Sequence, residues 1–110
     1  MIYNWIKLPL FDSWDYDYTT VIQGKSYTLR LSYNNRTETW SLDISLEEGT
    51  DLLQGESLIP YKPTGLDKIQ DLTGCFWLEP VSIDDNETLL HPSLLFKYFN
   101  FYYIYLPEDV

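Results

Sequence analysis

Two short stretches of this chain decide its fold. Residues 27–33 read Tyr-Thr-Leu-Arg-Leu-Ser-Tyr, residues 40–46 read Trp-Ser-Leu-Asp-Ile-Ser-Leu, and six polar residues separate them. In both stretches large apolar residues alternate with small or charged ones, and this period is typical of a strand that is buried on one face. The pattern therefore predicts an antiparallel hairpin closed by a polar loop.

One register of this hairpin aligns every side chain. It pairs four apolar couples on the inner face, Tyr33 with Trp40, Leu31 with Leu42, Leu29 with Ile44 and Tyr27 with Leu46. On the outer face Arg30 meets Asp43, with serines and threonines around them. A slip of one residue would move the apolar set into water, so the pattern fixes the register. The exposed Arg30–Asp43 pair adds about 0.2–1 kcal/mol, which disfavours a slip but does not hold the hairpin.

The rest of the chain also has the features of short strands separated by turns. We predict further strands at residues 2–8, 18–23, 52–59, 76–78 and 99–106, and short helical turns at 66–72 and after Pro92. Residues 11–16 and 60–65 are predicted loops, residues 84–87 are a predicted acidic turn, and Gly55 indicates a bulge. The expected fold is all-β, a compact antiparallel β-sandwich or open barrel of about six to eight strands in a single domain, 1–110.

Charge and cysteine content exclude several classes of protein. The formal net charge is −10, and the seven bases are scattered, which argues against nucleic acid or an anionic membrane as a partner. Cys75 is the only cysteine, so no intrachain disulfide is possible. The first residues lack the pattern of a secretory signal, and no apolar run reaches about 18 residues, so we expect synthesis in a cytoplasm and no membrane span.

The sequence shows no pattern that indicates catalysis. His91 is the only histidine, and nothing nearby marks Ser93 or Cys75 as a nucleophile that it would activate. The acidic groups at residues 12–17 and 84–87 lack the central glycine of a calcium loop, so we interpret them as solvated loops. We expect no enzyme activity, no cofactor and no metal.

Aromatic residues make up 17% of the chain, more than a small core readily hides. Either the core is simply rich in aromatic rings or some of these rings contact other chains, and in the second case the candidates for the interface are Trp5, Trp14, Phe101, Tyr103 and Tyr105. Two alternatives stay open. A DNA mimic or enzyme inhibitor would array carboxylates on one face, and a carbohydrate-binding module would present a row of coplanar exposed rings such as Trp5, Trp14 and Trp77.

The hairpin sequence also resembles a known family. Residues 27–44 fit the pattern Tyr-Thr-Leu-Arg-Leu-x-Tyr-Asn-x-Arg-x-x-x-Trp-x-Leu-Asp-Ile, which includes Arg36 and Trp40. A following Leu-Leu-x-Gly segment is matched by residues 52–55. The first half of the chain is in this way similar to the baseplate plug proteins of phages with contractile tails, whereas residues from Pro60 onward match loosely.

The resemblance implies a structural protein of the virion. Such a protein lies in the tail baseplate near the tube axis, is assembled in the cytoplasm of the host bacterium, and contacts the hub–spike complex and the tail-tube initiator. The symmetry at that level of a tail implies several copies, with three as the expected number. Its role would be to close the hub and to take part in the change that accompanies contraction of the tail, and it would not be an enzyme.

Overall fold

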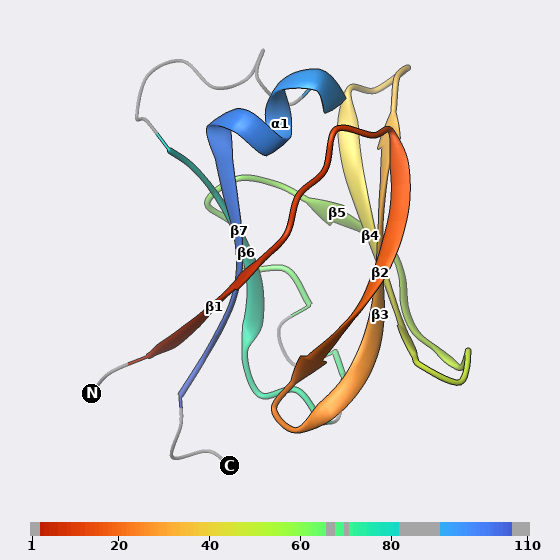
Figure 1. Ribbon diagram of the computed structural model, residues 1–110, viewed down its shortest axis with the longest axis vertical. Coiled ribbons are helices and arrows are strands. Elements are labelled where there is room, and N and C mark those ends of the chain that lie inside the picture. The colour runs from red at the N-terminus through yellow and green to blue at the C-terminus, as the bar shows by residue number, and fades with distance from the viewer. Residues whose placement is uncertain (1–2, 66–67, 70, 82–90, 107–110) are drawn as a thin grey trace.

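The computed structural model describes residues 3–65, 68–69, 71–81 and 91–106. Within them the chain forms seven strands and one short helix (Figure 1). The elements are β1 (Asn4–Leu8), β2 (Asp15–Ile22), β3 (Lys25–Asn34), β4 (Thr39–Leu46), β5 (Asp51–Leu58), β6 (Cys75–Pro80), α1 (Pro92–Tyr98) and β7 (Phe99–Tyr105).

The strands form two antiparallel sheets, which confirms the predicted all-β sandwich. A four-stranded sheet has the order β2-β3-β4-β5, and a three-stranded sheet has the order β1-β7-β6. In Figure 1 the three-stranded sheet lies on the left and the four-stranded sheet on the right. The sheets stay separate, so the alternative of an open barrel is not what the chain adopts.

The predicted hairpin register is confirmed at every position. Strands β3 and β4 pair Tyr33 with Trp40, Leu31 with Leu42, Leu29 with Ile44 and Tyr27 with Leu46. Six of these eight side chains are fully or almost fully buried, and Tyr33 and Leu46 are partly buried. Across the sandwich they meet the inner side chains of the three-stranded sheet, of which Phe76, Leu78, Phe101 and Tyr103 are the most deeply buried. Burial of alternate residues on both sheets therefore forms one core.

Arg30 corrects one detail of the prediction. It does stand opposite Asp43 in the register, but its guanidinium donates two hydrogen bonds to Asp15 of β2, at 2.9 and 2.6 Å. Asp43 instead accepts a hydrogen bond from the backbone N–H of Gly55, at 2.6 Å. A guanidinium forms two parallel bonds with one carboxylate, and Asp15 offers that geometry from the neighbouring strand. The Arg30–Asp43 ion pair was thus a wrong prediction, although both residues belong to the scaffold.

The start of one strand differs from the sequence prediction, whereas a bulge and the start of the helix agree with it. Strand β2 begins at Asp15, inside the stretch predicted as a loop. Register shifts between β4 and β5 confirm a bulge at Gly55, whose φ of 65° favours glycine. The helix begins at Pro92, as a proline suited to a first helical position predicts. Of residues 66–72, the described ones form turns, and the acidic stretch 84–87 lies outside the described residues.

A buried hydrogen-bond cluster joins the two sheets at one end of the molecule. The hydroxyl of Tyr103 on β7 donates to Oε1 of Gln23, in the β2–β3 turn, at 2.5 Å. The same hydroxyl accepts from the N–H of Gly74 at 2.8 Å, and Gln23 also bonds Thr73 through both its oxygen and its nitrogen. These hydrogen bonds give partners to polar groups of both sheets, and they therefore fix the relative position of the two sheets at this end.

Candidate protein-interaction surface

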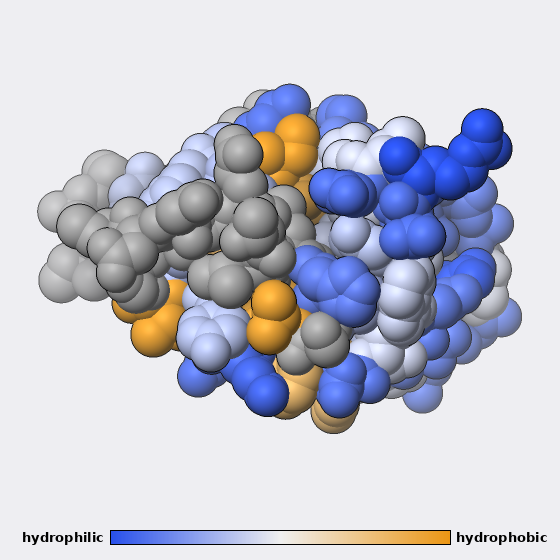
Figure 2. Space-filling view, turned by 90° about the horizontal axis from the view of Figure 1, so that it is seen from above, coloured by the Kyte–Doolittle hydropathy of each residue, from blue (hydrophilic) through white to orange (hydrophobic). Residues whose placement is uncertain are grey.

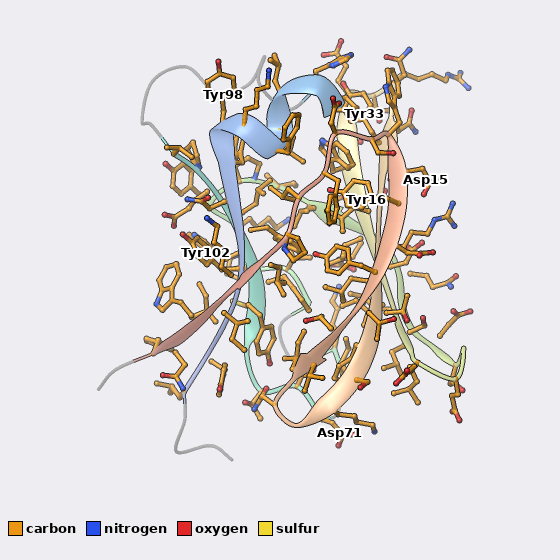
Figure 3. All side chains as sticks on the ribbon, in the orientation of Figure 1. Asp15, Tyr16, Tyr33, Asp71, Tyr98 and Tyr102 are labelled. Carbon is orange, nitrogen blue, oxygen red and sulfur yellow. The ribbon has the colours of Figure 1, made fainter. Side chains whose placement is uncertain are left out.

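The two outer faces of the sandwich have opposite character. The outer face of the four-stranded sheet carries serines, threonines and the Asp15–Arg30 ion pair. Figure 2, seen from above, shows this right-hand side of the molecule in blue to white, the hydrophilic end of the scale. Figure 3 labels Asp15 on this side and Tyr102 on the opposite, outer side of the three-stranded sheet. Aromatic side chains therefore lie on the outer face of the three-stranded sheet, whereas the outer face of the four-stranded sheet is mostly polar, with Val21 as an exposed aliphatic residue.

The strand registers define this outer surface, which we call the aromatic face. Its residues form two rows across the three strands. One row joins Trp5, Ile104 and Cys75, and the other joins Lys7, Tyr102 and Trp77. Their neighbours along each strand point into the core, as the burial of alternate residues on β6 and β7 shows.

Edge-to-face contacts hold the rings of the aromatic face in place. The ring of Trp5 lies 5.1 Å from that of Tyr102, centroid to centroid, at an interplanar angle of 81°. Trp77 packs against Tyr61, in the segment between β5 and β6, at 6.3 Å, and its indole N–H donates to the carboxylate of Glu79 at 2.9 Å. Because these contacts fix the rotamers in advance, little side-chain entropy would be lost when a partner covers them.

A surface pocket of about 450 Å³ lies at one end of the aromatic face. Side chains from all three strands line it, including Trp5, Trp77 and Ile104. Gly74 lies at its border, where a Cβ atom would stand 1.9 Å from the carbonyl oxygen of Ile104. Only glycine fits this close approach of two backbones, so the shape of the pocket depends on that residue.

The charges on this face are few. Lys7 and Glu79, which lies next to Trp77 on the same face of β6, are its basic and acidic residues, and their signs are opposite. Burial raises the pKa of the Cys75 thiol, so this sulfur is neutral and behaves as a small apolar group. An apolar surface that is rigid and nearly free of charge is typical of the central part of a protein–protein interface.

The predicted interface residues are only partly brought together. Trp5 is 51% exposed on β1, at the edge of the aromatic face, and Tyr105 is half-buried beside the pocket. Phe101 and Tyr103 are 0% exposed. Their side chains fill the core, so they offer no surface to a neighbouring chain and do not belong to the candidate interface.

Trp14 is also exposed, at 46%, but it lies elsewhere. Its ring makes edge contacts with Tyr33 at 5.3 Å and with His91 at 5.3 Å, next to the start of α1. It therefore belongs to a separate cluster at the end of the hairpin. His91 is in this way packed among aromatic rings in a solvent-exposed position, as a structural residue would be.

Tyr102, Ile104 and Trp77 belong to the aromatic face but were not among the predicted interface residues. The prediction chose the half of β7 that contains Phe101 and Tyr103, although that half points inward. A signal was available, because Asn100 lies on the same strand face as Tyr102 and Ile104, and Glu79 lies on the same face as Trp77. A polar residue in a strand marks the face that is turned to solvent.

Two further searches concern the described part of the chain. Within it, no three side chains of the His, Cys, Asp or Glu type are grouped so that they could hold a metal ion. Of its helices, none has the length and apolar character needed to cross a membrane.

Fold and face together define a β-sandwich protein with a rigid, largely apolar outer face on its three-stranded sheet. Comparison with known families then gives its place. The family model described as the cyanophage baseplate Pam3 plug gp18 matches residues 5–106, and the chain belongs to this family of phage baseplate plugs. No curated protein matches it. The match extends the resemblance seen in the hairpin to nearly the whole chain, including residues beyond Pro60, and it indicates a structural component of the tail baseplate that contacts other baseplate or tail proteins.

Proposed function

We propose that this protein is a non-enzymatic plug that packs among the hub–spike complex and the tail-tube initiator near the tube axis, with the aromatic face as its docking surface. It is present in several copies, three by the symmetry expected there, and is assembled in the host cytoplasm. Its role is to close the hub region and to accompany the change that occurs on contraction. The observation that carries the docking surface is the exposed ring of Trp5, which packs edge to face against the half-buried Tyr102.

The residue types on this face favour specific docking. Tryptophan and tyrosine are enriched among the residues that dominate binding energies, and they act best at the centre of a contact. Trp5, Tyr102 and Trp77 lie on three adjacent strands, so one partner segment would cover them together. A polar outer face on the other sheet leaves the opposite side of the molecule solvated in the assembly.

The two alternative functions fit the geometry less well. A DNA mimic requires carboxylates at phosphate-like spacing, whereas the outer face of the four-stranded sheet neutralises Asp15 with Arg30. A sugar-binding platform requires coplanar rings, whereas Trp5 and Tyr102 meet at 81° and Trp14 lies in a different cluster. Neither alternative therefore gains support from the arrangement of the side chains.

A matched pair of substitutions tests the proposal. Trp5→Ala removes a half-exposed ring from the aromatic face, and Trp14→Ala removes a half-exposed ring with an equivalent edge contact to one tyrosine. Each variant is mixed with the purified hub, spike and tail-tube proteins of the same phage, and binding is measured by calorimetry. We expect Trp5→Ala to weaken binding by at least 2 kcal/mol, as in interface hot spots (about 2–4 kcal/mol), and Trp14→Ala to leave it unchanged.

The result that contradicts the docking surface is the reverse order of the two effects. Equal binding by the wild type and Trp5→Ala would also exclude the aromatic face. Absence of binding to any of these tail proteins, with the wild type folded, would contradict the hub location itself.

A further inference from the structure

The four edges of the two sheets differ in whether they can accept another strand. The free side of β6 is already covered, because Thr64 exchanges two backbone hydrogen bonds with Phe76, at 3.0 and 2.8 Å. A third bond runs from the N–H of Tyr61 to the carbonyl of Leu78, at 2.9 Å. The segment that leads from β5 to β6 thus shields this edge.

Both edges of the four-stranded sheet are also protected. On β5 the bulge at Gly55 breaks the regular pairing, and its N–H is occupied by the carboxylate of Asp43. On β2 the outward side chains include Asp15 and Asp17, and a strand laid beside them would bury carboxylates. Bulges and charged side chains are the usual means by which sheet edges avoid unwanted pairing.

Strand β1 has neither a bulge nor a covering segment among the described residues, and its protection is limited to one charged side chain. Among the described residues, its backbone hydrogen bonds run only to β7, so its other side is unpaired. Trp5 stands exposed on this strand, and Ile6 and Leu8 face the core, which gives β1 apolar side chains on both faces. Its one charged residue, Lys7, has a long aliphatic stem that can lie along apolar surface while the ammonium stays in water.

We propose that β1 receives an extended segment of a positively charged tail protein, which adds a fourth strand to the three-stranded sheet at its free edge. This inference rests on the proposed function and adds to it the mode of docking. Main-chain hydrogen bonds to β1 supply affinity, and an apolar side chain of the added strand packs beside Trp5 and continues the aromatic face. The aromatic face and the free edge meet at Trp5, so one segment engages both.

Charge selects the occupant. The chain has 17 acidic residues and seven basic ones, and three of the bases are held in ion pairs with Asp15, Glu56 and Asp71. Two copies of such an acidic chain repel one another, whereas a cationic protein is attracted over a distance. The free edge of β1 therefore fits a basic partner better than it fits a second copy of this chain.

Hydrogen–deuterium exchange of the full chain tests the strand addition. The wild type is measured alone and with an excess of each purified hub, spike and tail-tube protein of the same phage. Pairing at the free edge should slow exchange within the peptide covering residues 4–8 by at least tenfold, while the peptide covering β2 exchanges as before. Raising the salt concentration should weaken the binding, because the attraction is partly electrostatic.

Each other outcome overturns a defined part of the inference. Binding that leaves residues 4–8 unprotected excludes strand addition but keeps the proposed function, whereas absence of binding to all these proteins removes both. Protection of residues 4–8 that grows with the concentration of this chain alone identifies a second copy as the occupant. Binding that is insensitive to salt excludes a partner selected by its positive charge.

Discussion

Removal of one hydroxyl in the buried cluster should loosen the contact between the two sheets. In Tyr103→Phe the ring remains in the core, but Gln23 loses its donor at 2.5 Å and the N–H of Gly74 loses its acceptor at 2.8 Å. A lost hydrogen bond costs about 1 kcal/mol, and a buried N–H left without a partner costs about 1–3 kcal/mol. We therefore expect the free energy of unfolding to fall by about 2 kcal/mol.

Urea unfolding followed by tryptophan fluorescence measures this loss. With a dependence on urea of about 1.5 kcal/mol per molar, the midpoint should fall by about 1.3 M. Tyr102→Phe is the matched control, because Tyr102 lies at the neighbouring position of β7 on the outer face. Its hydroxyl has no hydrogen bond to another described residue. Its midpoint should stay within the error of the wild type. Equal midpoints for Tyr103→Phe and the wild type would refute the role assigned to the cluster.

The same substitution has a pH signature. Burial raises the pKa of Tyr103 from 10.0 to about 12, so the protonated hydroxyl is the form that the folded state favours. A raised pKa contributes stability that is fully present below pH 10 and is lost as the pH rises through about 12. The stability gap between the wild type and Tyr103→Phe should therefore be constant below pH 10 and become smaller above it.

Three other substitutions give distinct expectations. Gly74→Ala forces a Cβ to 1.9 Å from the Ile104 carbonyl oxygen, so the free energy of unfolding measured in urea should fall by about 1–3 kcal/mol. An unchanged urea midpoint would show that the two backbones are not in contact. Gly55→Ala meets open space at a φ of 65°, so only backbone strain of about 1 kcal/mol should appear in the same assay, and a larger loss would indicate crowding. Asp15→Asn should cost at most about 1 kcal/mol at pH 7, because the pair with Arg30 is exposed. The Arg30 hydrogen bond lowers the pKa of Asp15 below 3.8, so this difference should persist above pH 3.8 and vanish as the pH falls through the lowered value in acid unfolding curves; a difference that is independent of pH would contradict the ion pair.

The hairpin shows why so much of this fold could be predicted. Inward and outward residues alternate without interruption in both stretches, and the apolar sets are of equal length, so only one register buries them all. A bulge at Gly55 and a helix that begins at Pro92 were equally local, since each depends on the backbone preference of one residue. Local rules of this kind need no knowledge of what lies across the sandwich.

The errors arose where distant strands meet. The partner of Arg30 was missed because Asp15 and Tyr16 were assigned to a loop. In the structure they begin β2, in which Tyr16 and Tyr18 alternate with Asp15 and Asp17. Strand β7 is apolar on both faces, so hydrophobicity alone did not tell the core side from the outer side. That choice depends on β1 and β6, which lie beside β7 in space but far from it in the sequence.

The half-buried thiol of Cys75 has a consequence for the durability of the particle. Thiol oxidation and disulfide exchange proceed through the thiolate, and burial raises the pKa of Cys75 and so keeps that species scarce. Outside a reducing environment, a thiol that stays protonated reacts slowly with oxidants and with other thiols. Burial of this sulfur therefore disfavours covalent bonds between Cys75 and neighbouring proteins of the baseplate.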